Sequence, residues 1–131
     1  MLEEPSINKI KITVLTVVYN DERNIQKTLD SVVGQDYPQL EYIIIDGKST
    51  DGTLKIVEKY NDKIDVIISE SDDGIYDAMN KGTKLASGQY ISYLHSGDRF
   101  YSSKTISNVF SHLKEKPDII YGNYYVEYPN G

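Results

Sequence analysis

Residues 10–20 read IKITVLTVVYN, and this stretch decides the fold class. β-branched and apolar side chains fill almost all of it, which predicts a buried β-strand over Ile10–Val18. A strand without regular polar–apolar alternation is typical of a parallel sheet covered on both faces. The chain therefore begins its fold with a strand that has to lie inside a sheet.

Segments with helical spacing and segments with strand-like spacing alternate along the rest of the chain. Further strands are predicted at Glu41–Asp46, Asp65–Ser69, Gln89–Leu94 and Asp118–Tyr125, and helices at Asp21–Gln35, Thr53–Tyr60, Gly74–Ala86 and Lys104–Lys114. Such alternation builds right-handed βαβ units. The predicted fold is α/β and Rossmann-like, with three layers: a mainly parallel sheet of about five strands and helices on both of its faces.

The predicted helices have candidate terminal residues. Asn20 or Asp21 is expected to cap the first helix. Thr50 or Asp51 is expected at the start of the second, and Gly88 at the end of the third. The 131 residues fit one domain, assigned to residues 10–131 after an N-terminal tail over residues 1–9.

The composition is that of a globular protein with an excess of acid. The net charge is −6, which disfavours binding to nucleic acid. No cysteine is present, so disulfides and thiolate metal sites are excluded. Residues 1–11 do not resemble a signal peptide, and no apolar run approaches the ~20 residues of a membrane-spanning helix. A cytoplasmic location is expected, with peripheral contact at the inner membrane face as a variant.

Polar segments follow each of the first four predicted strands. They are TVVYNDE at 16–22, DGKSTDGT at 46–53, ESDDG at 70–74 and HSGD at 95–98. Taken singly, each is explained as well by helix capping or by a turn. Because the carboxyl ends of parallel strands share one edge, where such sheets bind ligands, the four together predict a binding site.

Other classes of α/β protein fit less well. Neither the glycine-rich dinucleotide motif nor the P-loop motif occurs. A receiver-type signalling domain has similar length, but it needs an aspartate after the third strand and a lysine after the fifth. Here those positions read Ser69-Glu70 and Tyr121-Gly122-Asn123.

Four blocks, in order, resemble family 2 glycosyltransferases of the GT-A fold, in particular members from bacterial polysaccharide synthesis. They are ITVLTVVYN at 12–20 with Glu22 beyond it, EYIIIDGKSTDGT at 41–53, DDGIYDAMNKG at 72–82 and SGQYISYLHSGD at 87–98. The second block is similar to the family's IVDDGSTDGT run. The resemblance covers roughly residues 10–125 and implies a domain that binds a nucleotide sugar, with UDP as the favoured nucleotide.

The resemblance also implies roles for individual residues. The nucleotide-sugar-binding residues it implies are Thr16, Val18, Tyr19, Asn20, Glu22, Asp46, Ser49, Asp73, Asn80, Lys81, Ser96 and Gly97. Tyr19 and Asn20 would line the base and ribose pocket with Thr16, and Glu22 would support it. Asp46 would accept hydrogen bonds from the base. Asp73, Asn80 and Lys81 would lie near the ribose and the diphosphate.

Asp98 is the residue that the resemblance assigns to a divalent cation, Mn²⁺ or Mg²⁺. Such a cation would neutralise the diphosphate as the sugar–phosphate bond breaks. The family's D-x-D motif is reduced here, because His95 and Gly97 stand where acids are common. The implied reaction is inverting transfer of a sugar to a hydroxyl of a glycan or of a lipid-linked acceptor.

The resemblance places the acceptor half and the catalytic base beyond Gly131. The alternative to an active transferase is therefore a fragment that binds nucleotide without transferring sugar. A domain without its acceptor half would also expose apolar surface, so self-association into a homo-oligomer is a further expectation.

Overall fold

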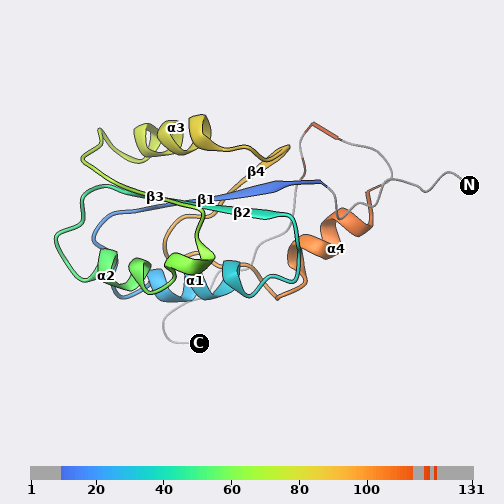
Figure 1. Cartoon of the computed structure of the whole chain (residues 1–131), viewed down its shortest axis with the longest axis horizontal. Helices are drawn as coiled ribbons and strands as arrows, with labels where there is room; N and C mark the ends of the chain where they lie inside the picture. Colours follow the sequence, from blue (N-terminus) through green and yellow to red (C-terminus); the bar gives the residue numbers. More distant parts are fainter. Residues whose placement is uncertain (1–9, 114–116, 119, 121–131) are drawn as a thin grey trace, which may run out of the picture.

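The computed structural model describes residues 10–113, 117–118 and 120, and Figure 1 shows them in sequence colours. In chain order the elements are β1 (Ile12–Val18), α1 (Ile25–Val33), β2 (Leu40–Asp46), α2 (Thr53–Glu58), the 3₁₀ turn η2 (Asn61–Lys63), β3 (Val66–Ser69), α3 (Ile75–Leu85), β4 (Tyr90–Tyr93) and α4 (Thr105–Ser111). The four strands form one parallel sheet in the order β3-β2-β1-β4.

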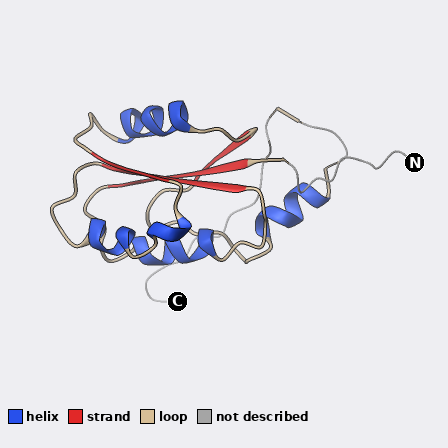
Figure 2. Cartoon of the chain, viewed as in Figure 1, coloured by secondary structure: helices blue, strands red, loops and turns tan. Residues whose placement is uncertain are grey.

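The sheet is the middle of three layers. Helix α3 covers one face, and α1, α2 and α4 lie on the other (Figures 1 and 2). The predicted α/β architecture with a parallel sheet and helices on both faces is confirmed. The predicted tail over residues 1–9 and almost all of the predicted strand at Asp118–Tyr125 lie outside the described residues.

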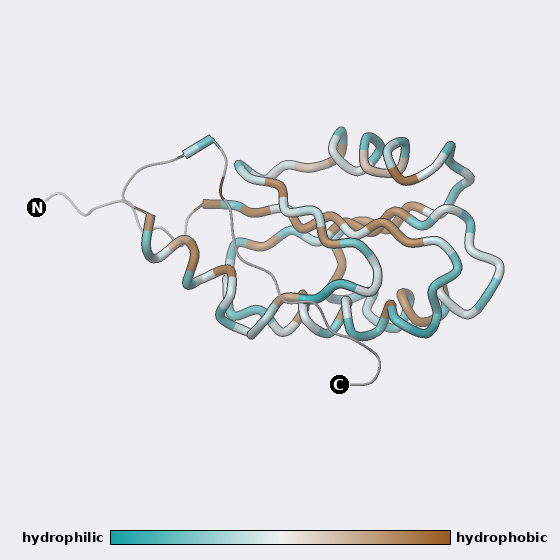
Figure 3. The backbone as a smooth tube through the Cα atoms, turned by 180° about the vertical axis from the view of Figure 1, so that it is seen from behind, coloured by the Kyte–Doolittle hydropathy of each residue, from teal (hydrophilic) through white to brown (hydrophobic). Residues whose placement is uncertain are grey.

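Strand β1 is buried at every position and pairs on both sides, with β2 and with β4. Figure 3 shows the most hydrophobic backbone running along the sheet between the helices. The two threonines of β1 are buried with their hydroxyls satisfied. Thr13 Oγ1 donates to Glu41 Oε1 at 2.8 Å, and Thr16 Oγ1 lies 2.9 Å from the Tyr42 hydroxyl. Alternate side chains of β1 therefore serve two cores without leaving a polar group unpaired.

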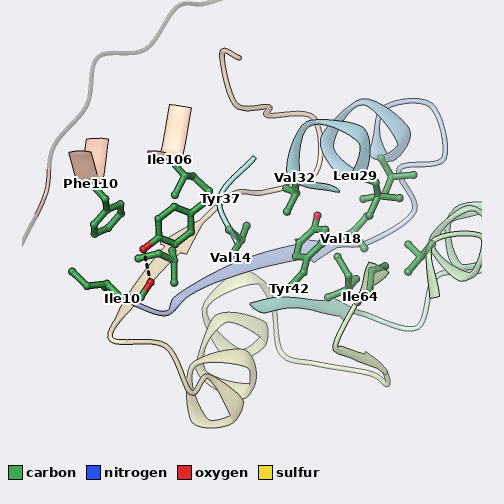
Figure 4. Packing of buried hydrophobic residues seen from close by; sticks show 14 residues of the cluster. Ile10, Val14, Val18, Leu29, Val32, Tyr37, Tyr42, Ile64, Ile106 and Phe110 are labelled. Atoms are coloured by element: carbon green, nitrogen blue, oxygen red, sulfur yellow. Dashed lines mark hydrogen bonds between the residues drawn. The ribbon is translucent and has the colours of Figure 1, made fainter. Parts of the chain in front are cut away.

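The larger core lies between the sheet and helices α1, α2 and α4 (Figure 4). In this core, aromatic side chains connect α4 to the segment that leads into β1. The Tyr37 hydroxyl donates to the Ile10 carbonyl, and the Tyr37 and Phe110 rings pack with centroids 5.7 Å apart. These contacts hold α4 against the start of β1, so α4 belongs to the same packed unit as the sheet.

Two predicted helix ends are wrong. Helix α1 begins at Ile25, four residues after Asp21, and neither Asn20 nor Asp21 caps it. Their side chains instead bind neighbouring loops, as described below. Helix α3 ends at Leu85, because Ala86 is already extended, so Gly88 does not terminate it. A side chain at Gly88 would place Cβ 2.6 Å from the Thr13 amide nitrogen, and this close approach explains the glycine.

The start of the second helix agrees better with the prediction. Asp51 Oδ1 accepts a hydrogen bond from the Thr53 amide at 2.9 Å, and Gly52 occupies the position before the helix. Across the described part of the chain, no helix combines the length and the apolar character needed to cross a membrane.

Helix α3 packs on the sheet through Gly82. A Cβ at this position would lie 2.2 Å from Leu15 Cδ1, and Leu15 is fully buried. Replacing a helical glycine by alanine normally stabilises a helix by about 1 kcal/mol. We expect Gly82→Ala to destabilise the protein by about 1–3 kcal/mol because the core is overpacked. Urea unfolding measures the change.

Lys84→Ala is the matched control, since Lys84 is an exposed residue of the same helix. It should change the free energy of unfolding by no more than about 0.5 kcal/mol. A Gly82→Ala protein as stable as wild type would contradict the packing described for α3.

Glu41 ties the start of β2 to the segment before β4. Its carboxylate accepts hydrogen bonds from the Ser87 amide at 2.9 Å and the Ser87 hydroxyl at 2.6 Å, and Lys11 Nζ lies 3.5 Å away. Burial raises the pKa of Glu41, but the donors of Ser87 and Thr13 and the charge of Lys11 outweigh it and lower the pKa from 4.5 to about 2.

The lowered pKa of Glu41 makes folding stability depend on pH. Stabilisation from a depressed carboxyl pKa is complete above the unfolded value and is lost as pH falls through the folded value. We expect the stability gap between wild type and Glu41→Gln to shrink by roughly 2–3 kcal/mol between pH 5 and pH 2. Urea unfolding across this range tests it, with Glu58→Gln on the surface of α2 as control. A gap independent of pH would contradict the expectation.

Candidate functional site

The carboxyl ends of the four strands lie at one end of the sheet, the left side of Figure 1. Each strand is followed by a loop with one residue of positive φ: Asn20 (46°), Lys48 (64°), Gly74 (111°) and Gly97 (99°). This backbone conformation is uncommon for residues other than glycine, asparagine and aspartate. The left-handed Lys48 in particular has to be held by its surroundings.

Asn20 joins the loop after β1 to the loop after β2. Its side-chain Oδ1 accepts a hydrogen bond from the Thr50 backbone amide at 2.7 Å, and its backbone amide donates to Ser49 Oγ at 2.8 Å. Glu22 adds a second link, because its Oε2 accepts from the Gly52 amide at 2.9 Å. The predicted residues Asn20, Glu22 and Ser49 are therefore brought together, chiefly as supports for one another.

Asp46 lies beneath these loops and is 0% exposed. Its carboxylate accepts hydrogen bonds from the Ser49 amide at 3.0 Å, from the Ser49 hydroxyl and from Ser69 Oγ at 2.7 Å. A direct contact between Asp46 and a base is not open in this structure, because all its oxygen surface is covered. Asp46 instead positions Ser49, which in turn receives the Asn20 amide.

The predicted residues at the end of β1 differ in their exposure to solvent. Tyr19 is 59% exposed, whereas Thr16 and Val18 are buried. The Thr16 hydroxyl is already paired with Tyr42. Thr16 and Val18 therefore form the floor under this end of the sheet, and the Tyr19 ring is the accessible aromatic surface above it.

The loop after β4 is held against α1. Ser96 Oγ donates to Asp21 Oδ2 at 2.7 Å. Thr28 Oγ1 accepts from the Gly97 amide at 2.9 Å and donates to the Asp98 carbonyl at 2.6 Å. The backbone on both sides of Asp98 is thus fixed, while its side chain is exposed.

Asp21 and Thr28 were not among the predicted site residues. Asp21 stands in a polar strand-end segment, which is a signal for the site, but the same position also predicts a helix cap. Thr28 is buried within α1, where a threonine in a helical pattern carries no sign of a contact 70 residues further along the chain.

Lys81 is engaged by its own neighbourhood on the α3 side. Its ammonium group donates to the Ser71 carbonyl at 2.9 Å and lies 3.2 Å from Glu70 and 3.6 Å from Asp77. Burial lowers the pKa of Lys81, but the hydrogen bond and charge of Glu70, with the charge of Asp77, raise it overall. Its positive charge is therefore already partly neutralised.

The remaining predicted residues on this side are Asp73 and Asn80, and both are exposed. The Asp73 amide donates to Asp77 Oδ2 at 3.0 Å, which places Asp73 at the start of α3. Among the described residues, no hydrogen bond or ion pair joins Asn80 or Lys81 to the loops after β1 and β2. The structure therefore groups the predicted residues into two sets, one around Tyr19 and one along α3.

In the described part of the chain, no group of three or more His, Asp or Glu residues is arranged to hold a metal ion. Asp98 is a single exposed carboxylate. Close to it in the same turn, His95 Nδ1 is buried and has no hydrogen-bond partner within the described residues. The Asp98 amide donates to the His95 carbonyl at 3.0 Å, so the two residues belong to one tight turn.

An all-parallel sheet with polar loops at its carboxyl edge defines the class of Rossmann-like α/β proteins that bind ligands at that edge. Within this class, the model of glycosyl transferase family 2 matches residues 13–131. The chain belongs to this family, and the resemblance found in the sequence is confirmed.

Curated relatives span more than twice the length of the matched region. WfaP of Escherichia coli, a UDP-Glc:alpha-D-GlcNAc-diphosphoundecaprenol beta-1,3-glucosyltransferase, is 33% identical over 117 residues, which are 88% of this chain and 47% of WfaP. TuaG of Bacillus subtilis, a putative teichuronic acid biosynthesis glycosyltransferase, is 36% identical over 96 residues, which are 71% of this chain and 38% of TuaG.

Solved structures agree in fold. TarS of S. aureus (residues 1–349) in complex with UDP-GlcNAc matches with a TM-score of 0.72 and 30% identity, over 78% of this chain and 30% of that one. The mannosyltransferase PcManGT of Pyrobaculum calidifontis, in complex with GDP-Man and Mn²⁺, matches with a TM-score of 0.73 and 26% identity, over 81% of this chain and 33% of that one.

Asn20 has two separable properties. Its side chain accepts a hydrogen bond from the Thr50 amide, and its backbone is in the left-handed conformation. Asn20→Gly removes the acceptor and keeps a relaxed backbone, whereas Asn20→Ala adds strain at positive φ. We expect both variants to speed hydrogen exchange of the Thr50 amide. Asn20→Ala should be less stable than Asn20→Gly by about 1–2 kcal/mol.

Hydrogen exchange and urea unfolding measure these two effects. Arg23→Ala, at an exposed position of the same loop, is the control and should change neither. Unaltered protection of the Thr50 amide in both Asn20 variants would show that this hydrogen bond does not order the loop.

Proposed function

We propose that this chain binds the donor substrate of an inverting glycosyltransferase, a nucleotide-diphosphate sugar with UDP as the favoured nucleotide. One observation carries the proposal. The Asp21–Ser96 hydrogen bond of 2.7 Å joins the loop that carries the exposed Tyr19 to the loop that carries the exposed Asp98. An aromatic surface for a base and a carboxylate for a metal–diphosphate group are thereby held on one rigid edge.

Each predicted residue has a role in this proposal. The Tyr19 ring stacks on the base, an interaction worth about 1–3 kcal/mol in nucleic-acid complexes. Asn20 and Ser49 shape the ribose pocket, with Glu22 holding the neighbouring loop. Thr16, Val18 and Asp46 form the buried support. Ser96 and Gly97 position the loop of Asp98. Asp73, just before α3, and Asn80 and Lys81 within α3 face the ribose and phosphates.

Asp98 is the residue we assign to Mn²⁺ or Mg²⁺. Divalent cations of this kind are often held by one or two carboxylates, with substrate phosphate oxygens and water in the other positions. A single exposed carboxylate on a fixed turn fits that pattern. When bound, the cation would neutralise charge on the diphosphate leaving group. The complex of PcManGT with GDP-Man and Mn²⁺ supports a divalent ion in the family.

The reaction proposed for the whole protein is direct displacement at the anomeric carbon by an acceptor hydroxyl, with inversion. A carboxylate would remove the proton of that hydroxyl. We place this base and the acceptor site outside the described residues, because the chain spans less than half the length of its curated relatives. The acceptor we favour is a glycan or lipid-linked sugar in surface polysaccharide synthesis, at the cytoplasmic side, as supported by WfaP and TuaG.

Calorimetry with UDP, with and without Mn²⁺, tests donor binding. We expect Mn²⁺-dependent affinity, abolished by a chelator and lowered by at least about 10-fold in Asp98→Asn, the scale of loss seen even for groups that only surround metal ligands. Asp62→Asn is the control, since Asp62 lies in η2 and carries the same charge. UDP affinity insensitive to chelator and to Asp98→Asn would refute the metal role.

A second candidate function is nucleotide binding without sugar transfer. It is favoured because this chain spans less than half the length of its curated relatives. One measurement distinguishes it from the first candidate. Sugar transfer from a UDP-sugar panel to model acceptors, assayed with this chain alone, should be absent while UDP binding persists. Transfer by the chain alone would place the catalytic base within it.

A further inference from the structure

Within the described residues, Asp98 is held through its backbone alone. Its amide donates to the His95 carbonyl at 3.0 Å, and its carbonyl accepts from Thr28 Oγ1 at 2.6 Å. The side chain is exposed, and none of the described residues donates a hydrogen bond to its carboxylate. The direction in which this carboxylate leaves the chain is therefore set by the two backbone contacts.

The turn that carries Asp98 is anchored at successive amides. The Ser96 amide donates to the Val17 carbonyl of β1 at 3.2 Å, and the Gly97 amide donates to Thr28 Oγ1 at 2.9 Å. Gly97 has a φ of 99° at the third position of a four-residue turn, where positive φ favours glycine. Strand β1 thus fixes the entry into the turn, and a single hydroxyl of α1 fixes its exit.

The Thr28 hydroxyl uses both its acceptor and its donor capacity on this turn. Threonine is a poor helix former, and in a helix its hydroxyl can bond a carbonyl of the preceding turn. Thr28 is 0% exposed within α1, and its hydroxyl instead serves backbone groups about 70 residues further along the chain. Valine has nearly the same shape and could make neither bond. The hydroxyl, and not the bulk of the side chain, is the feature that the turn requires.

We propose that Thr28 is a positioning residue for the divalent cation of the donor complex and acts through Asp98. By fixing the backbone on both sides of Asp98, its hydroxyl presents the carboxylate already oriented, so less conformational freedom is lost when the cation–diphosphate group binds. Groups that orient metal ligands without touching the metal typically change metal affinity by 10–100-fold. The inference rests on the proposed donor site and adds to it a residue of α1.

Gln35 offers a matched control, because it holds the same segment beyond the turn. Its Nε2 donates to the Ser102 carbonyl at 2.6 Å, and its Oε1 accepts from the Ile106 amide at 3.1 Å. Gln35→Met keeps the length of the side chain and removes both bonds. It should lower stability by loosening the approach to α4, while the turn of Asp98 keeps its own anchors.

Two ligands separate positioning of the cation from general damage to the site. UDP with Mn²⁺ uses the base, the ribose and the cation–diphosphate group, whereas uridine lacks the diphosphate. We expect Thr28→Val to weaken Mn²⁺–UDP binding by at least about 10-fold and to leave uridine binding unchanged. Thr28→Ser restores the hydroxyl and should restore the affinity. Gln35→Met should bind both ligands as wild type does. Calorimetry measures each affinity.

A double-mutant cycle tests whether Thr28 acts through Asp98. In the Asp98→Asn background, Thr28→Val should cause no further loss of Mn²⁺–UDP affinity, because the carboxylate that it positions is gone. Urea unfolding establishes that each variant is folded. Thr28→Ala, which removes the hydroxyl and leaves space, replaces Thr28→Val in the same comparisons if the valine variant does not fold.

The outcomes distinguish this inference from the proposed function. If wild type binds no UDP, or binds it regardless of Mn²⁺, the proposed donor site or its metal role fails and the inference fails with it. If wild type shows Mn²⁺-dependent binding, three results overturn the inference alone. They are wild-type affinity in the variant without the hydroxyl, an equal loss for uridine, and an equal loss in Thr28→Ser.

Discussion

The structure depends on β1 being buried on both faces and paired on both edges. A strand in that position has no surface left for solvent, so its apolar side chains enter one of two cores and its threonine hydroxyls are hydrogen-bonded. Its neighbours have to be parallel, because each returns through a helix that covers a face of the sheet. All four strand ends then lie at the same edge, and that edge becomes the site.

Polar contacts join the loops after β1, β2 and β4 into one surface. Asp46, the last residue of β2, orients Ser49, and Ser49 Oγ accepts a hydrogen bond from the Asn20 backbone amide. Asp21 accepts a hydrogen bond from Ser96 of the loop after β4. A buried carboxylate is costly unless its oxygens are satisfied, and here all the bonds it accepts come from short serine contacts. The contacts of Asp46 and Ser49 hold the loop of Tyr19, and the contacts of Asp21 and Thr28 hold the loop of Asp98.

The same edge shows how a loop position can matter through the absence of a side chain. Gly82 and Gly88 let α3 and the segment before β4 approach β1 closely. Gly47 leaves room for Asp72 of the loop after β3, whose Oδ2 would lie 3.0 Å from a Cβ at that position. In each case the glycine is explained by an atom from a distant part of the chain, so its meaning depends on the fold.

The sequence by itself determined the fold class, the family and the segments that build the site, because apolar periodicity and strand–helix order are local properties that burial preserves. The starts and ends of helices, such as α1 at Ile25, were decided by tertiary contacts that took Asn20 and Asp21 away from capping. The tertiary structure also decided which acids are open. Asp46 and Asp72 look equally available in the chain, but one is enclosed by serines and the other faces the space left by Gly47, and only packing in three dimensions separates them.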